Sequence, residues 1–168
     1  MLVQEGKADQ FFARPMRASD LDHVVQMEAV LNEHPWSKRV FSDCLRAGYE
    51  CWVLANKQQV IAYGVMSVAI GESHLLALGV HADYQRRGYA RRLFQLLLDR
   101  AAKLDATQCY LEVRASNFAA ISLYRSMGFV QISTRKNYYP ASAGREDALI
   151  MCRGLAADLE GPAWPEQA

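Results

Sequence analysis

Cysteine pairs, a surplus of one charge and long apolar runs are all missing from this sequence. Its four cysteines form no CxxC pair, and its four histidines do not cluster with them. A zinc site needs such a cluster, so we expect no metal. Lysine and arginine together number 19, against 18 for aspartate and glutamate. This balance gives no indication of a direct nucleic-acid partner or of an anionic membrane surface.

Hydrophobic segments of membrane or export type are also missing. No run approaches the roughly 20 apolar residues of a membrane helix, and the first residues, MLVQEGKADQFF, lack the apolar core of a signal peptide. We therefore expect a reduced, cytoplasmic protein with no membrane partner. The length of 168 residues suits one domain. We place that domain at residues 10–153 and expect a loosely held C-terminal tail at residues 154–168.

Apolar periodicity predicts an α/β protein. The expected strands cover residues 11–16, 50–55, 60–69, 74–80, 107–113, 129–135 and 148–153, and the expected helices cover residues 20–31, 37–46, 88–103 and 118–127. Ser19, Ser37 and either Ser116 or Asn117 are the predicted helix caps. This order favours a mostly antiparallel sheet with helices on both faces.

A glycine turn follows the fourth expected strand. Residues 81–92 read HADYQRRGYARR, so a strand is followed by Gln85-x-x-Gly88-x-Ala90 and then by a helix. Free backbone N–H groups at a helix start attract anions, and glycine lets a ligand approach the backbone closely. The alternative is a solvated basic helix start. The segment lacks the Gly-Lys-Ser/Thr of a P-loop and the GxGxxG of a dinucleotide site.

The next segment extends this pattern. Residues 117–129 read N-x-x-A-x-x-L-Y-x-x-x-G-F, after the glycine turn, a helix and a strand. The whole order resembles the GNAT acetyltransferase superfamily. The resemblance implies the GNAT fold, an α/β fold whose mixed, mostly antiparallel sheet is splayed between the fourth and fifth strands, and acetyl-CoA as co-substrate. It implies cofactor contacts from Leu78, Gly79, Val80, Gln85, Arg86, Arg87, Gly88, Tyr89, Ala90, Arg91 and Asn117.

Two side chains suit acetyl transfer to an amine. The attacking amine must lose a proton, and an α-amine titrates at about 7.7–8.0 whereas lysine titrates at about 10.4. Glu112, a carboxylate within an apolar strand, is the candidate base, and Tyr124 is the candidate acid for the leaving thiolate. A structural ion pair between Glu112 and Arg114 is the alternative for the carboxylate. For Tyr124, which shares a helix face with Asn117, the alternative is core packing.

Further stretches narrow the resemblance. LEVRASN at 111–117, RKNYYP at 135–140, GREDA at 144–148 and HPWS at 34–37 look like the bacterial ribosomal-protein-alanine N-acetyltransferases. This family implies Glu112 as base, Tyr124 as acid and, as partner, the N-terminal alanine of a small-subunit ribosomal protein. Two residues depart from the family pattern: His34 stands where an aromatic or apolar residue is common before Pro-Trp, and Ala90 stands where glycine is common.

Candidate substrate contacts lie outside the reacting pair. Tyr138 and Tyr139, on an expected loop, offer flat apolar area to a peptide. Trp36 is a further candidate, with a core anchor between the first two helices as the alternative. The acids that could receive a basic peptide, or could be ordinary surface charges, are Glu28, Glu33, Glu146 and Asp147. Three functions stay open: N-terminal acetylation, acetylation of another amine (another protein N-terminus, a lysine or a small molecule), and non-catalytic acetyl-CoA binding as a ribosome-associated module.

Overall fold

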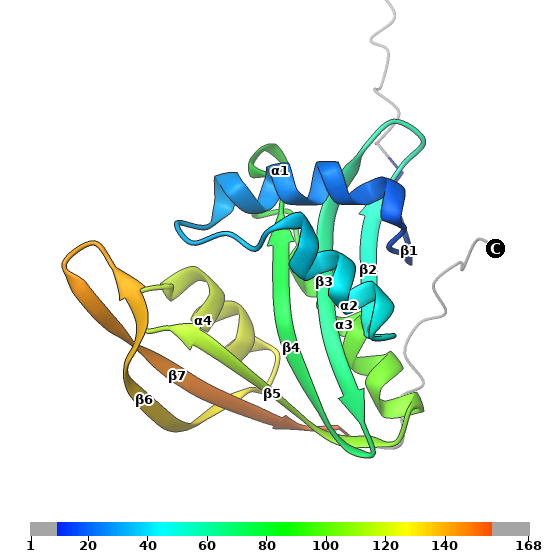
Figure 1. The fold of residues 1–168 in the computed structure, drawn as a ribbon. Helices are drawn as coiled ribbons and strands as arrows, with labels where there is room; N and C mark the ends of the chain where they lie inside the picture. The colour runs from blue at the N-terminus through cyan, green and yellow to red at the C-terminus, as the bar shows by residue number, and fades with distance from the viewer. Residues whose placement is uncertain (1–9, 156–168) are drawn as a thin grey trace, which may run out of the picture.

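The computed structural model describes residues 10–155, and the seven strands in this part form one sheet in the order β1-β2-β3-β4-β5-β7-β6 (Figure 1). The pairing of β4 with β5 is parallel, and the other neighbours are antiparallel. The strands are β1 (Phe12–Pro15), β2 (Glu50–Ala55), β3 (Val60–Ala69), β4 (Gly71–Val80), β5 (Ala106–Arg114), β6 (Val130–Ala141) and β7 (Gly144–Gly154).

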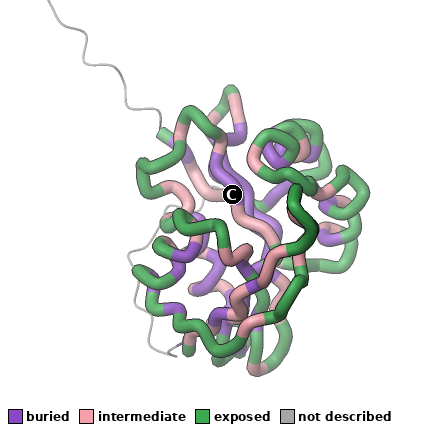
Figure 2. The backbone as a smooth tube through the Cα atoms, turned by 90° about the vertical axis from the view of Figure 1, so that its left-hand side faces the viewer, coloured by how far each residue is buried: buried purple, intermediate pink, exposed green. Residues whose placement is uncertain are grey.

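Four α-helices in the described part cover the two faces of this sheet. They are α1 (Leu21–Leu31), α2 (Lys38–Arg46), α3 (Tyr89–Lys103) and α4 (Phe118–Ser126). Helices α1 and α2 pack on one face around Phe41 and Tyr63, whereas α3 and α4 pack on the other around Phe94 and Tyr124. Most of the buried residues lie in the interior of the molecule, between the two helix layers (Figure 2). The predicted α/β order and the two covered faces are confirmed.

The sheet parts between β4 and β5. Their pairing runs from Gly71 opposite Ala106 to Leu75 opposite Leu111 and ends there. Beyond that point β4 stays paired with β3 as far as Val80, while β5 stays paired with β7. One edge of β4, from Leu76 onward, therefore faces a gap instead of a strand. The predicted splay between the fourth and fifth strands is confirmed.

Local hydrogen bonds explain where the helices begin. The Ser37 hydroxyl accepts a hydrogen bond from the Val40 N–H at 3.4 Å, and the Asn117 side chain accepts one from the Ala120 N–H at 3.2 Å. Both caps were predicted from the sequence. The predicted cap at Ser19 is wrong, because a 3-10 turn covers Ala18–Asp20 and α1 begins only after Asp20.

The last two strands are longer than predicted. Tyr138 and Tyr139 lie within β6 and not on a loop, since β6 and β7 continue as a hairpin until Ala141 faces Gly144. A register shift between Arg135 and Tyr139 hides this extension, because it breaks the apolar alternation that marks a strand. At the other end β7 reaches Gly154 and Leu155 is buried. Residues 156–168 of the expected tail lie outside the described part.

Candidate active site

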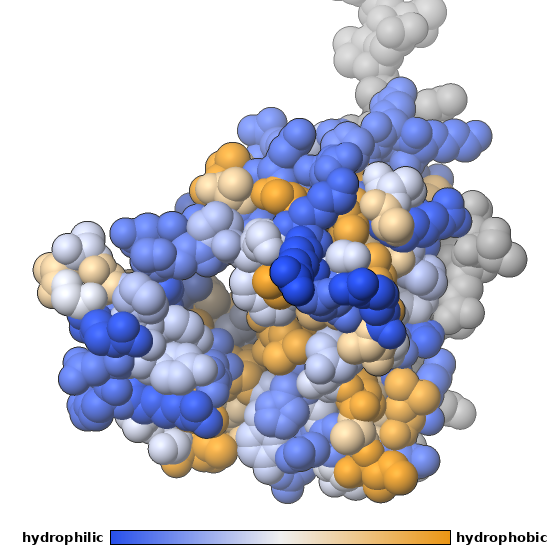
Figure 3. Space-filling view, viewed as in Figure 1, coloured by the Kyte–Doolittle hydropathy of each residue, from blue (hydrophilic) through white to orange (hydrophobic). Residues whose placement is uncertain are grey.

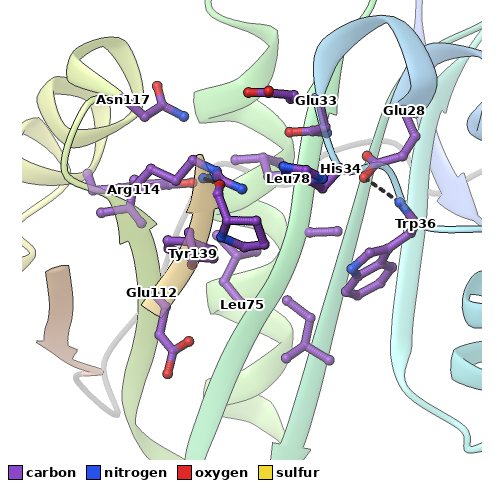
Figure 4. Close-up of a pocket in the computed structure, with 16 residues that line it drawn as sticks. Glu28, Glu33, His34, Trp36, Leu75, Leu78, Glu112, Arg114, Asn117 and Tyr139 are labelled. Carbon is purple, nitrogen blue, oxygen red and sulfur yellow. Dashed lines mark hydrogen bonds between the residues drawn. The ribbon is translucent and has the colours of Figure 1, made fainter. Parts of the chain in front are cut away.

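A cavity of about 290 Å³ opens where the sheet parts. The space-filling view shows the hollow between the α1–α2 loop and the β6–β7 hairpin (Figure 3), and the close-up shows its walls (Figure 4). One wall comes from α1 and its following loop, one from the free edge of β4, and one from β5, α4 and the hairpin. The lining residues discussed below are Glu28, Glu33, His34, Trp36, Leu78, Glu112, Arg114, Asn117, Tyr124 and Tyr139.

Glu112 and Tyr124 reach this cavity from opposite faces of the sheet. On β5, Leu111 and Val113 are buried in the core beneath α3 and α4, so the alternation of the strand turns Glu112 to the other face. Tyr124 belongs to α4 and is buried in that same core. The two side chains share one cavity because β4 no longer closes the gap at this level.

The Glu112 carboxylate contacts the hairpin and not its own strand. Its Oε1 lies 3.5 Å from the Nη1 of Arg135, and interaction with the same carboxylate raises the pKa of the Tyr138 hydroxyl. The alternative pair with Arg114 does not form. Arg114 instead bonds the Glu146 carboxylate at 2.9 Å and the Pro140 carbonyl at 2.7 Å. The Glu112 side chain is 32% exposed, so it remains accessible to a ligand in the cavity.

Tyr124 combines packing with access to the cavity. Its ring packs at 5.7 Å from Phe94 and 6.1 Å from Phe129, as the core-packing alternative requires. Burial raises the pKa of its hydroxyl. Within residues 10–155 that hydroxyl takes part in no hydrogen bond, although Tyr124 lines the cavity. A phenol of this kind holds its proton at neutral pH and is available to donate it.

Tyr139 closes the hairpin side of the cavity. Burial, with the nearby Glu112 charge, raises its pKa to about 12. The Arg114 guanidinium lies over its ring at 4.4 Å, and Glu146, which holds Arg114, also accepts a hydrogen bond from the Ser116 N–H at 3.3 Å. These contacts tie the hairpin to the segment that leads into α4. Tyr139 and Asn117, the cap of that helix, both line the cavity.

The predicted phosphate turn lies at the end of β4. Gln85 donates its side-chain N–H to the Val80 carbonyl at 3.1 Å, and Gly88 caps α3 with a φ of 82°. A side chain on Gly88 would meet nothing within 4 Å, so conformation and not space calls for glycine here. The first N–H groups of α3, from Tyr89 to Arg91, lack partners within the helix, as at any helix start.

The remaining residues of this turn are placed as follows. Arg86 has a positive φ of 61°, and the Arg87 guanidinium lies 5.4 Å from the Tyr84 ring. Arg91 donates to the Ser126 hydroxyl at 2.5 Å, while Ala90 and Tyr89 pack against the core. Gly79 lies directly beneath the Tyr63 ring, where an added Cβ would come within 2.4 Å. The predicted cofactor residues from Leu78 to Arg91 therefore run from the β4 edge to the start of α3, whereas Asn117 lies apart from them at the start of α4.

Glu28 and Trp36 support the opposite wall. Glu28 is buried at 5% exposure and accepts hydrogen bonds from the Tyr63 hydroxyl and, at 3.1 Å, from the Trp36 N–H. The Trp36 ring packs 5.2 Å from Phe41 of α2, which is the anchoring contact, and it also lines the cavity. No sequence pattern indicates Tyr63 or Arg135 as a partner, because each meets its carboxylate across more than 20 residues of chain.

Other site classes find no support in the described part. No group of three or more histidine, cysteine, aspartate or glutamate side chains within residues 10–155 could hold a metal ion. Its helices are all too short or too polar to cross a membrane. The four cysteines are free, and three of them, Cys44, Cys51 and Cys109, are buried.

A mixed sheet that parts between two parallel strands, next to a glycine turn that opens a helix, defines the acetyltransferase class of α/β fold. The chain belongs to the Acetyltransferase (GNAT) family, which residues 16–129 match. It is 38% identical over 136 residues to the [Ribosomal protein bS18]-alanine N-acetyltransferase of Escherichia coli strain K12, an alignment that covers 81% of this chain and 92% of the relative.

Solved structures agree with this assignment. The ribosomal-protein-S18-alanine N-acetyltransferase from Escherichia coli superposes with a TM-score of 0.82 at 34% identity, covering 92% of this chain and all of that one. Arabidopsis thaliana NAA60 in complex with acetyl-CoA gives a TM-score of 0.79 at 18% identity, covering 87% of this chain and 99% of the other. The second likeness extends to the fold alone.

Proposed function

We propose that this protein transfers the acetyl group of acetyl-CoA to the N-terminal α-amine of a protein, and that its substrate is the N-terminal alanine of a small-subunit ribosomal protein. The observation that carries the proposal is the shared cavity of Glu112 and Tyr124 at the parting of the sheet. The name of the Escherichia coli relative supports the ribosomal substrate. Such a substrate places the reaction in the cytoplasm and requires no direct nucleic-acid contact and no membrane.

The path along β4 fits acetyl-CoA. The free edge from Leu76 to Val80 offers backbone N–H and C=O groups to the amides of a pantetheine arm. The helix start at Gly88, with the arginines around it, suits a diphosphate. Asn117 lines the same cavity, and we expect its side chain to bond the same arm. Acetyl-CoA supplies a thioester, which an amine can attack with release of a thiolate.

Glu112 and Tyr124 have opposite roles in proton transfer, as general base and general acid. Glu112 accepts the proton that the α-ammonium must lose, and Arg135 and Tyr138 hold the carboxylate in place. Tyr124 delivers a proton to the departing sulfur and so prevents the thiolate from reversing the reaction. The phenol is protonated at neutral pH, so it has a proton to give as negative charge develops on the sulfur.

A panel of amine acceptors tests the proposal. Hexapeptides with free N-terminal alanine, serine or glycine, N-terminally blocked lysine peptides and small polyamines would be incubated with acetyl-CoA, and release of CoA would be measured. The expected result is turnover of the free N-terminal alanine peptide at least about tenfold above the lysine peptides. Preference for a lysine or a small amine would assign another acceptor. Acetyl-CoA binding without turnover of any acceptor would favour the non-catalytic alternative.

A further inference from the structure

The acids around the cavity differ in how far the protein already uses them. Two of them, both on the hairpin, are already paired: Glu146 bonds Arg114 and the Ser116 N–H, and Asp147 bonds Lys136 and the Asn137 N–H. Glu28 is buried and holds Trp36 and Tyr63. Each of these three carboxylates has a structural task, so none offers an unopposed charge to a substrate.

Glu33 is the exception. It is exposed and lines the cavity, and within residues 10–155 no ion pair or hydrogen bond engages its carboxylate. Figure 4 places it with His34 on the α1–α2 side of the cavity, across from Asn117 and Arg114. It is the acid that remains available at this opening.

The loop that carries Glu33 is held at both ends by one residue. The Asn32 N–H donates to the Glu28 carbonyl at 3.0 Å, and the Trp36 N–H donates to the Glu28 carboxylate at 3.1 Å. Glu28 is itself fixed by Tyr63 in the core. A charge on a loop fixed in this way has a defined position, so less entropy is lost when a ligand pairs with it.

We propose that Glu33 gives the enzyme a preference for peptides that carry a lysine or arginine directly behind the residue to be acetylated. The inference rests on the proposed function, because it places the reacting amine between Glu112 and Tyr124 inside the cavity. The second side chain of such a peptide then lies toward the opening, where Glu33 is the unpaired charge. An exposed pair of this kind favours the cationic peptide by about 2–5-fold in kcat/KM at low salt.

The test compares three hexapeptides that differ only in the second residue, Ala-Arg, Ala-Gln and Ala-Glu, with the wild type, Glu33→Gln and Glu33→Lys. The ratio of kcat/KM for Ala-Arg over Ala-Gln is expected to be about 2–5 in the wild type and to fall to about 1 in Glu33→Gln. Glu33→Lys should reverse the order and favour Ala-Glu. Glu72→Gln, which removes an exposed acid paired with His74 on β4, is the matched control and should keep the wild-type ratio.

The outcomes separate this inference from the proposed function. An arginine preference that persists in Glu33→Gln, or a wild type that turns over Ala-Arg and Ala-Gln equally, overturns the role of Glu33 and leaves N-terminal acetylation standing. A wild type that acetylates none of the three peptides overturns the proposed function and this inference with it. Raising the salt from about 0.05 to 0.5 M should shrink the wild-type ratio, since added ions screen an exposed pair.

Discussion

The Nη1 of Arg135 on β6 lies 3.5 Å from the Oε1 of Glu112 on β5, although β7 runs between these two strands in the sheet. This contact joins the candidate base to the hairpin that also carries Tyr138 and Tyr139. The same hairpin is tied to the segment before α4 by Arg114 and Glu146. The position of the carboxylate and the shape of the cavity wall therefore depend on one supersecondary unit.

The role of Glu112 can be tested by measuring how the effect of Glu112→Gln on kcat/KM changes with pH. In Glu112→Gln, kcat/KM should fall by about 100-fold at pH 6 and by less than about tenfold at pH 9, because an α-amine with a pKa of about 7.7–8.0 is mostly neutral at the higher pH and needs no base. Initial rates with an N-terminal alanine peptide from pH 6 to 9 measure this. Glu72→Gln serves as the control. Equal losses at every pH would remove Glu112 from proton transfer.

Tyr124→Phe should separate chemistry from binding. We expect kcat to fall by about 10²–10⁴-fold, since the ring stays packed while the proton donor is lost. The dissociation constant for acetyl-CoA, measured by calorimetry, should change by less than about threefold. Tyr49→Phe, at an exposed tyrosine, is the control. A loss of only twofold in kcat would leave Tyr124 as a core residue.

The raised pKa of Tyr124 predicts a further property. Its proton is held more tightly in the folded protein than in the unfolded chain, so its contribution to stability is complete below pH 10 and is lost as the pH rises above that value. The free energy of unfolding, measured with urea, should therefore decrease more steeply from pH 9 to pH 11 in the wild type than in Tyr124→Phe. Parallel curves for the two proteins would contradict the burial of this phenol.

The sequence predicted those features that local chemistry determines. The caps at Ser37 and Asn117 follow from short polar side chains before apolar runs, and the turn at Gly88 follows from glycine at a helix start. The resemblance supplied the parted sheet. The contacts of Glu112 with Arg135 and of Glu28 with Tyr63 were not predicted, because pairing between distant strands leaves no periodic signal in either segment.

Asp20 should make folding sensitive to acid. Burial alone would raise its pKa, but hydrogen bonds from the Arg14 side chain, at 2.7 and 2.8 Å, and from the Arg17 N–H lower it overall. Because the pKa is lower in the folded state, the ionised carboxylate stabilises the fold above about pH 4. This stabilisation is lost as the pH falls through the pKa of Asp20 in the folded protein. Asp20→Asn should cost about 1–3 kcal/mol at pH 7 and much less at pH 3 in urea unfolding. The exposed pair of Asp22 with Lys38 provides the control, and Asp22→Asn should shift the unfolding midpoint far less.

Gly48 provides a matched control for a substitution of Gly88 in the phosphate turn. Both have a positive φ, 82° at Gly88 and 74° at Gly48, and an added Cβ would meet nothing within 4 Å at either position. Alanine at each should therefore cost a similar roughly 1 kcal/mol of stability, from backbone conformation alone. Gly88→Ala should also raise the KM for acetyl-CoA by about tenfold, because relief of the strain moves the first N–H groups of α3. Gly48→Ala, at the end of α2, should leave that KM unchanged. If both variants lose stability and neither changes the KM, the diphosphate does not bind at the start of α3.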